Sequence, residues 1–321
     1  MNKRDFEVNN LNDFVGQQNL TKQLKVYIFS AKKRQDSLDH ILFYGPPGLG
    51  KTTLARILAK EMEVPILQVS APTIEKISDL LSIVSQIKPN SILFLDEIHR
   101  LAPEIEEVMY EVMESFKLSI VYKTQSESKT IKFDVPKFTL IGATTQAGNL
   151  SFPLRTRFSI IYRFKFYEFE EMKQICLQNS KKLNLNLKED IIKEIASKSR
   201  NTPRTLNNIL KRLADYCLFN KISEIKQETL ITFFSFLGIY ENGINEEDLA
   251  FIKTLKENYK NVPTSIESIA ASLNENPTNL RNINEPFLVK NGIIARGKRG
   301  RYLTEKGLEI YRKISENEVH Y

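Results

Sequence analysis

The sequence predicts an α/β fold built on a parallel sheet, followed by an all-helical segment and a small unit that ends in a hairpin. Three observations carry this prediction. A glycine-rich loop separates an apolar run at 41–44 from a helical pattern that begins near Leu54. Further apolar runs at 92–95 and 138–142 suit strands that are covered on both faces of a parallel sheet. Residues 168–238 then show helical periodicity almost throughout.

The glycine-rich loop, Gly45–Thr53, fits the pattern G-x-x-x-x-G-K-[ST] and lies between a predicted strand and a predicted helix. Around Gly48 and Gly50, backbone N–H groups can turn inward to surround phosphate oxygens, and the following helix N-terminus adds positive potential. We expect Lys51 to reach the β- and γ-phosphates and the Thr52 hydroxyl to ligate Mg²⁺. These flanks favour binding of a nucleoside triphosphate over a simple Gly/Pro-rich turn.

The apolar run at 92–95 ends in two acids, Asp96 and Glu97. Open α/β sheets bind their ligands at the carboxyl ends of the strands. We therefore expect Asp96 to hold the Mg²⁺ shell and Glu97 to polarise the attacking water. The alternative is that the two acids only mark the exit of the strand into a loop. The next strand ends in Thr144 and Thr145, where a hydroxyl can sense the γ-phosphate, although β-propensity alone also explains threonine there.

Arginines downstream of the strands are candidates for a second set of phosphate contacts. Arg155 and Arg157 carry the planar, permanent charge that suits a transferring phosphoryl group, with solvated surface arginines as an equal alternative. Thr202 and Pro203 are typical of a helix N-cap and first residue. Arg204, in the first turn of that helix, opposes the helix dipole, which indicates that it faces an external anion.

Composition sets broad limits on the protein class. The chain of 321 residues is long enough for two or three domains, and its net charge of +7 permits an anionic partner such as nucleic acid without requiring one. Cys176 and Cys217 lie on helical stripes and are predicted to be reduced core thiols, and no cluster suggests zinc. Without an apolar leader or a membrane-length run, we expect a cytoplasmic protein with no membrane partner.

The C-terminal part is predicted to be a winged helix. Helices are expected at Glu246–Glu257, at Ile266–Leu273 with Thr264 and Glu267 as a capping box, and from Pro277 onward. A hairpin then pairs 293–295 with 301–303. From residue 290 to 301 the segment holds five basic residues and no acid, which favours nucleic-acid contact over a solvated turn. These basic residues are Lys290, Arg296, Lys298, Arg299 and Arg301.

Taken together, these segments resemble the RuvB family, the Holliday-junction branch-migration motors of bacteria. The segments that carry the resemblance are Phe43–Thr53, Leu95–Arg100, Phe138–Thr145, Pro153–Phe158, Thr202–Arg204, Glu285–Leu288 and the basic hairpin. They cover nearly the whole chain in order. The resemblance implies a large AAA+ P-loop ATPase domain at 1–167, an all-α lid domain at 168–238 and a winged-helix DNA-binding domain at 239–321.

The resemblance also implies roles for individual residues with ATP and Mg²⁺. Lys51, Thr52 and Thr53 would bind phosphates and Mg²⁺, and Asp96 and Glu97 would form the Walker B pair. Thr145 would be the first sensor and Arg204 the second. Arg157 would be the arginine finger offered to a neighbouring subunit. Glu114, Ser115, Phe116 and Tyr167 match other positions near the nucleotide, and Arg296 and Arg301 match DNA-contacting arginines.

The partners implied by the resemblance are double-stranded DNA at four-way junctions, further copies of the chain in a homohexamer, and a RuvA-like junction-binding protein docked on a hairpin at 118–135. A RuvC-like resolvase is a further candidate, and the setting is recombination, DNA repair and the SOS response to DNA damage. The chain departs from the family pattern at Phe6–Val8, at Gln146, at Thr156 and in the hairpin tip at 123–129.

Two rival classes stay open at this point. One is a clamp-loader-like or remodelling AAA+ ATPase that acts on a protein partner. The other is a DNA-binding regulator in which the nucleotide sets conformation without translocation. The winged helix argues against the first class, and the pair Asp96–Glu97 together with Arg157 argues against the second.

Overall fold

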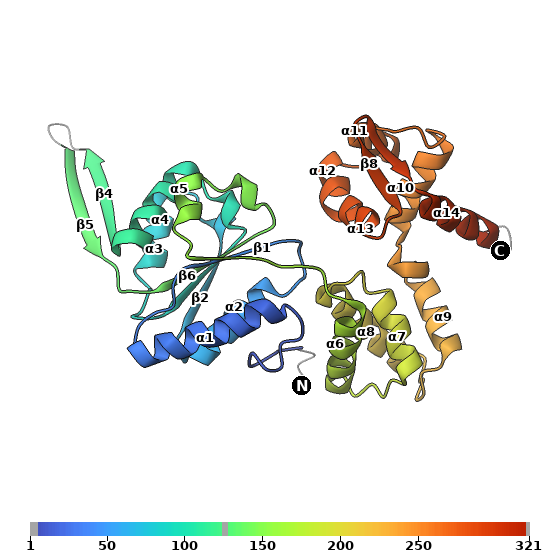
Figure 1. The fold of residues 1–321 in the computed structure, drawn as a ribbon, viewed down its shortest axis with the longest axis horizontal. Helices are drawn as coiled ribbons and strands as arrows, with labels where there is room; N and C mark the ends of the chain where they lie inside the picture. The colour runs from blue at the N-terminus through green and yellow to red at the C-terminus, as the bar shows by residue number, and fades with distance from the viewer. Residues whose placement is uncertain (1–5, 124–127, 319–321) are drawn as a thin grey trace. The chain divides into compact units, whose positions relative to one another are not determined.

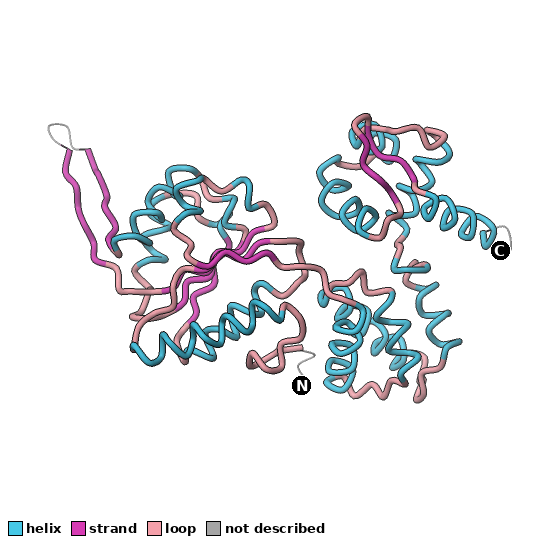
Figure 2. The backbone as a smooth tube through the Cα atoms, viewed as in Figure 1, coloured by secondary structure: helices cyan, strands magenta, loops and turns pink. Residues whose placement is uncertain are grey.

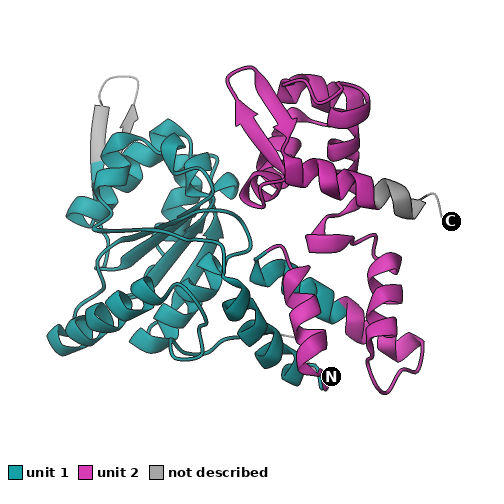
Figure 3. Cartoon of the chain, turned by 45° about the vertical axis from the view of Figure 1, so that its right-hand side comes forward, with its two compact units in different colours: residues 1–185, 201–211 teal, residues 186–200, 212–321 magenta. Residues whose placement is uncertain are grey.

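The computed structural model describes residues 6–123 and 128–318. Figure 1 shows the course of the chain, and Figure 3 divides it into two compact units. The first unit comprises 1–185 with 201–211, and the second comprises 186–200 with 212–321. Helix α8, Pro203–Phe219, begins in the first unit and ends in the second.

The first unit is built on a parallel sheet, as the sequence predicts. The sheet has five strands in the order β2-β3-β6-β1-β7. The strands are Ile66–Ser70 (β2), Ile92–Asp96 (β3), Thr139–Thr144 (β6), Ile41–Tyr44 (β1) and Ile160–Arg163 (β7). The interior strands β3 and β6 are the continuous apolar runs, because both of their faces are covered. The edge strand β7 was not predicted, because four residues with alternating partial burial give only a weak hydrophobic pattern for a strand.

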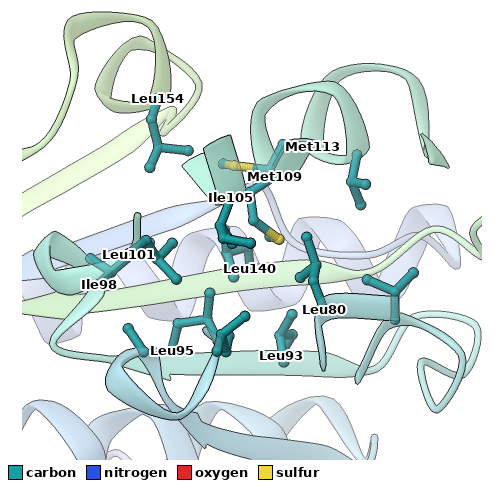
Figure 4. Close-up of a cluster of buried hydrophobic side chains, with 14 of the residues drawn as sticks. Leu80, Leu93, Leu95, Ile98, Leu101, Ile105, Met109, Met113, Leu140 and Leu154 are labelled. Atoms are coloured by element: carbon teal, nitrogen blue, oxygen red, sulfur yellow. The ribbon is translucent and has the colours of Figure 1, made fainter. Parts of the chain in front are cut away.

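Helices cover both faces of this sheet (Figure 1). One face carries α1 (Gln18–Arg34) and α2 (Lys51–Met62), and the other carries α3 (Ile77–Val84), α4 (Pro103–Ser115) and α5 (Phe152–Thr156). Figure 4 shows leucines of β3 and β6 packed under side chains of α3 and α4. Each fully buried leucine of this kind contributes about 1.5–3 kcal/mol, so the core holds the ends of the strands in fixed positions.

A separate two-stranded hairpin follows α4 and confirms the one predicted at 118–135. It pairs β4 (Lys117–Lys123) with β5 (Ser128–Asp134) in antiparallel register, from Lys117 opposite Asp134 to Lys123 opposite Ser128. Figure 2 shows this ribbon projecting away from the parallel sheet. Of the divergent tip at 123–129, residues 124–127 lie outside the described residues.

The segment after the sheet is helical, as predicted, with α6 (Phe169–Lys182), α7 (Glu189–Ser197), α8 and α9 (Gln227–Phe236). The backbone N–H of Thr205 donates to the Thr202 hydroxyl at 3.3 Å, so Thr202 caps α8 as the sequence indicates. Cys176 and Cys217 are free and buried, and burial raises the pKa of Cys176 to about 12. Within the described residues, no helix combines the length and apolar character needed to cross a membrane.

The C-terminal part contains the predicted three helices and hairpin of a winged helix. Its elements are α10 (Glu246–Glu257), α11 (Ile266–Leu273), a helical run of α12 (Pro277–Asn279), a π turn (Leu280–Asn284) and α13 (Glu285–Lys290), then β8 (Ile294–Gly297), β9 (Gly300–Leu303) and α14 (Glu305–Glu318). The predicted capping box is wrong. Ser265 caps α11 by accepting from the Ser268 N–H at 3.1 Å, whereas the backbone of Thr264 pairs with Arg301 of β9.

This pairing makes Gly300 a position that tolerates no side chain. Its φ is +141°, and a Cβ there would lie 2.3 Å from the carbonyl oxygen of Thr264. Gly292 provides a matched comparison, because its φ is +65° but a Cβ would meet nothing within 4 Å. We expect Gly292→Ala to cost about 1–2 kcal/mol, the strain of a left-handed residue, and Gly300→Ala to cost clearly more. Urea unfolding of the two variants measures this, and equal destabilisation would contradict the steric argument.

Candidate nucleotide-binding site and basic hairpin

The site lies where three adjacent strands end. β6 pairs with β3 on one side and with β1 on the other, so the carboxyl ends of all three meet at one edge of the sheet. The phosphate loop follows β1, the two acids close β3, and Thr145 follows β6. A cavity of about 370 Å³ opens at this edge. Of the residues predicted for the site, it is lined by Gly48, Gly50, Lys51, Thr52, Thr53, Asp96, Glu97, Thr145 and Arg204.

The helical segment contacts the phosphate loop directly through Arg204. The backbone N–H of Arg204 donates to the Gly48 carbonyl at 3.3 Å. Gly48 has a φ of +78°, and a Cβ on it would lie 2.9 Å from the Cβ of Arg204. Only glycine therefore allows both the turn of the loop and this close approach of the arginine.

Lys51 is a buried cation on the loop. Its Nζ donates to the carbonyl oxygens of Gly45 at 2.7 Å and Pro46 at 2.9 Å. Burial lowers the pKa of Lys51 to about 8, although the nearby carboxylates of Glu97 and Asp96 act in the opposite direction. A phosphate group in the cavity would favour the charged amine, so anion binding and protonation of Lys51 are linked.

Glu97 adopts a left-handed backbone conformation, with φ of +52°, immediately after β3. Its Oε2 accepts from the Thr145 hydroxyl at 3.3 Å and lies 3.2 Å from Nδ1 of His99. The same His99 nitrogen is 2.9 Å from the Thr144 hydroxyl, and burial lowers the pKa of this imidazole. His99 belongs to the segment Leu95–Arg100 that carries the family resemblance, and the structure makes it a direct neighbour of Glu97.

Other residues that line the cavity were not predicted. Asn207, Asn208 and Lys211 share one face of α8 with Arg204, and this helical spacing is a signal that could have found them. The N-terminal segment at 6–8 also lines the cavity, with Nζ of Lys211 lying 5.2 Å from the centre of the Phe6 ring. No local pattern marks that segment, since tertiary folding brings it to the loop, and only the family resemblance singles out 6–8.

The remaining predicted residues do not line this cavity. Arg157 lies elsewhere, with its Nη2 2.9 Å from the carboxylate of Glu114, a hydrogen bond to the Tyr110 hydroxyl, and its guanidinium 4.5 Å from the Tyr110 ring centre. Ser115 donates to the Glu111 carbonyl, and Phe116 packs edge-on against Phe138. Tyr167 is buried beside the loop, where its hydroxyl donates to the Leu49 carbonyl at 3.0 Å.

The oxygen donors at the cavity fit a magnesium ion that is bound together with a nucleotide. Thr52 offers a hydroxyl and Asp96 a carboxylate, and both line the cavity. Mg²⁺ commonly takes one or two protein oxygens and completes its shell with phosphates and waters. An all-protein site is not present, since the described residues contain no group of three or more His, Cys, Asp or Glu that could hold a metal.

In the basic hairpin, the four predicted DNA-binding residues differ in their surroundings. Arg296 and Arg301 both bond the carboxylate of Glu285. Lys298 and Arg299 lie at the exposed turn between β8 and β9, with no ion pair to any described residue. The hairpin therefore presents two cations at its turn that pair with no described residue. The other two, Arg296 and Arg301, face each other across the strands next to the turn and are bound to Glu285.

The fold and the phosphate loop define a P-loop ATPase of the AAA+ class with a C-terminal winged helix. Three family models match the chain in succession. The Holliday junction DNA helicase RuvB P-loop domain matches 7–164, the RuvB AAA lid domain matches 167–239, and the RuvB C-terminal winged helix domain matches 241–312. The chain belongs to the RuvB family.

Relatives and solved structures agree with this assignment. The chain is 45% identical to the Holliday junction branch migration complex subunit RuvB of Helicobacter pylori, over 92% of this chain and 87% of the relative. Identity to the corresponding subunit of Campylobacter hominis is 44%, over 93% and 87%. The structure of the Thermotoga maritima RuvB Holliday junction branch migration motor superimposes with a TM-score of 0.86 at 36% identity, covering 96% of this chain and 98% of that one.

The buried lysine gives nucleotide binding a defined pH dependence. Only the protonated amine attracts phosphate, and its pKa of about 8 means that protonation is lost between pH 7 and 9. The Kd for ATP should therefore rise about tenfold over this interval. Calorimetric titration in EDTA measures this without a contribution from metal. Lys51→Arg keeps its charge across the range and should show a flat profile, so an equally steep profile in that variant would contradict the assignment to Lys51.

Proposed function

We propose that this chain is an ATP-driven motor that moves four-way DNA junctions during homologous recombination and DNA repair. The observation that carries the proposal is that one chain of the RuvB family combines the phosphate-loop cavity with a basic winged-helix hairpin. The first supplies a site for ATP, and the second supplies a surface for DNA phosphates. The names of the relatives, which are subunits of a branch migration complex, support the same role for this chain.

In the proposed reaction, the loop holds the nucleotide and Glu97 orients the attacking water. Lys51 and the backbone N–H groups of the loop would bind the β- and γ-phosphates. Glu97 suits a water-orienting role because its carboxylate borders the cavity and is held by Thr145 and His99. Mg²⁺, bound through Thr52 and Asp96, would neutralise charge on the phosphates.

Arg157 and Arg204 are proposed to act on different nucleotides. Arg204 lines the cavity of its own chain and contacts Gly48, which supports a role as the second sensor that responds to the bound nucleotide. Arg157 does not line that cavity, and its partner Glu114 is a surface residue of the same unit. This supports a role for Arg157 as the finger that completes the site of a neighbouring subunit, with Glu114, Ser115 and Phe116 near the same interface.

The proposed assembly is a homohexameric ring that works with a RuvA-like protein. The β4–β5 hairpin supports this docking role, because Ile131 and Phe133 leave 44% and 46% of their surfaces exposed on a projecting ribbon. We also propose a RuvC-like resolvase as a further partner of the ring and the cytoplasm as the location of the protein. We also keep the domain limits at 1–167, 168–238 and 239–321, which the limits of the three matching family models support.

The direct test is migration of a synthetic four-way junction, with ATP and with or without a RuvA-like protein. The wild type should separate the arms of the junction, and Glu97→Gln should bind ATP but lose hydrolysis and migration by about 10²-fold or more, the scale of a general base. Glu75→Gln, which removes an exposed carboxylate of the same unit, is the control and should behave as wild type. Wild type that hydrolyses ATP without moving the junction would favour the alternative, a clamp-loader-like or remodelling ATPase.

A mixing experiment tests whether Arg157 acts between subunits. Arg157→Ala should abolish hydrolysis, since an arginine finger contributes about 10³–10⁵-fold to kcat. Lys51→Ala should abolish it as well, because the loop loses its contact with the β- and γ-phosphates. In an equal mixture, about a quarter of the interfaces join an intact loop to an intact finger, so hydrolysis should partly return. The double variant Lys51→Ala/Arg157→Ala mixed with Arg157→Ala has no such interface and serves as the control. A mixture of the single variants as inactive as this control would refute the role in trans.

A further inference from the structure

A buried carboxylate lies beneath the basic hairpin. Glu285, the first residue of α13, leaves only 1% of its side chain exposed. Its Oε1 accepts from Nε of Arg301 at 2.8 Å and from Nε of Arg296, and its Oε2 accepts from Nη2 of Arg301 at 3.3 Å. One acid thus joins both strands of the hairpin to the helix. Burial alone would raise the pKa of Glu285, but the hydrogen bonds from the two arginines outweigh it, so the pKa is lowered and the carboxylate is ionised at neutral pH.

The two arginines are held differently. Arg301 is bound through two of its nitrogens and leaves 17% of its side chain exposed, which makes it largely a structural partner of Glu285. Arg296 is bound through Nε, with 55% of its side chain exposed. Its terminal nitrogens make no hydrogen bond to a described residue and remain available, and such a planar fork suits a phosphate group.

We propose that Glu285 is a positioning residue for DNA binding: it fixes Arg301 on β9 and holds Arg296 of β8 by Nε, so that the terminal nitrogens of Arg296 meet a DNA phosphate. This inference rests on the proposed contact between the hairpin and DNA. The position of Glu285 is itself supported, because the preceding residue Asn284 is buried and donates to the Asp248 carboxylate at 2.8 Å. An arginine that is already ordered loses less side-chain entropy when it binds.

Simple electrostatics makes the opposite prediction. A carboxylate close to a DNA-binding surface repels phosphate, so its removal would strengthen DNA binding if Glu285 did no more than carry charge. If Glu285 positions Arg296, its removal must weaken DNA binding even though the net charge of the hairpin region becomes more positive. The sign of the change therefore separates the two mechanisms.

The experiment measures the affinity of the full chain for duplex DNA by fluorescence anisotropy over a range of salt concentrations. Glu285→Gln and Arg296→Ala should each weaken binding by about tenfold and flatten the plot of log affinity against log salt by about 0.9, the loss of one phosphate contact. Glu309→Gln is the matched control, because it removes an exposed carboxylate of α14 in the same unit. That variant should keep the wild-type slope.

The outcomes distinguish this proposal from the proposed function. If Arg296→Ala leaves affinity and slope unchanged, this contact between the hairpin and DNA is wrong. If Arg296→Ala weakens binding but Glu285→Gln binds DNA as well as or better than wild type, the positioning role is overturned. Should Glu285→Gln fail to fold, Glu285→Asp takes its place. The shorter acid keeps the charge but retracts from Arg296, and an unchanged salt slope in that variant would equally overturn the proposal.

Discussion

The site depends on the parallel pairing of β6 with both β1 and β3. Because the three strands run in the same direction, the phosphate loop, the acids after β3 and the threonines after β6 are delivered to one edge of the sheet. The leucine-rich core beneath α3 and α4 keeps the strands in this register. A shift of one strand by a single residue would turn its buried side chains to the opposite face, so the catalytic geometry and the stability of the fold depend on the same contacts.

Burial is used at the site to tune charge rather than only to stabilise the fold. Lys51 lies among carbonyl groups in a partly desolvated position, which lowers its pKa to about 8 in spite of two neighbouring acids. Binding of a phosphate strongly stabilises the protonated form of such a buried amine, because the anion compensates for the water that the amine has lost. The left-handed backbone at Glu97 similarly directs its carboxylate to Thr145 and His99, at a conformational cost that the surrounding sheet absorbs.

Local patterns predicted the interior strands, the phosphate loop and the helices and hairpin of the winged helix, because each of these elements is encoded by a short run of consecutive residues. The features that were predicted wrongly or not at all have a common cause, which is that they depend on tertiary contacts. Thr264 was expected to cap α11, but its backbone pairs with β9, and Ser265 takes the role instead. The short edge strand β7 exists through its pairing with β1. The contact of Arg301 with Glu285 joins a strand to a helix across a turn, and no local sequence pattern identifies such a pair.

Buried ion pairs in the second unit specify geometry more than they add stability, since desolvation offsets much of their attraction. Asp248 is fully buried and binds Arg200 at 3.0 Å, while Asn284 donates to the same carboxylate. Asn284 immediately precedes Glu285, which holds the hairpin arginines. Removing one partner of such a pair costs about 3–5 kcal/mol, because a buried charge is left alone. Asp248 thus holds Asn284, the residue before Glu285, and so fixes the start of α13 from which the hairpin arginines are bound.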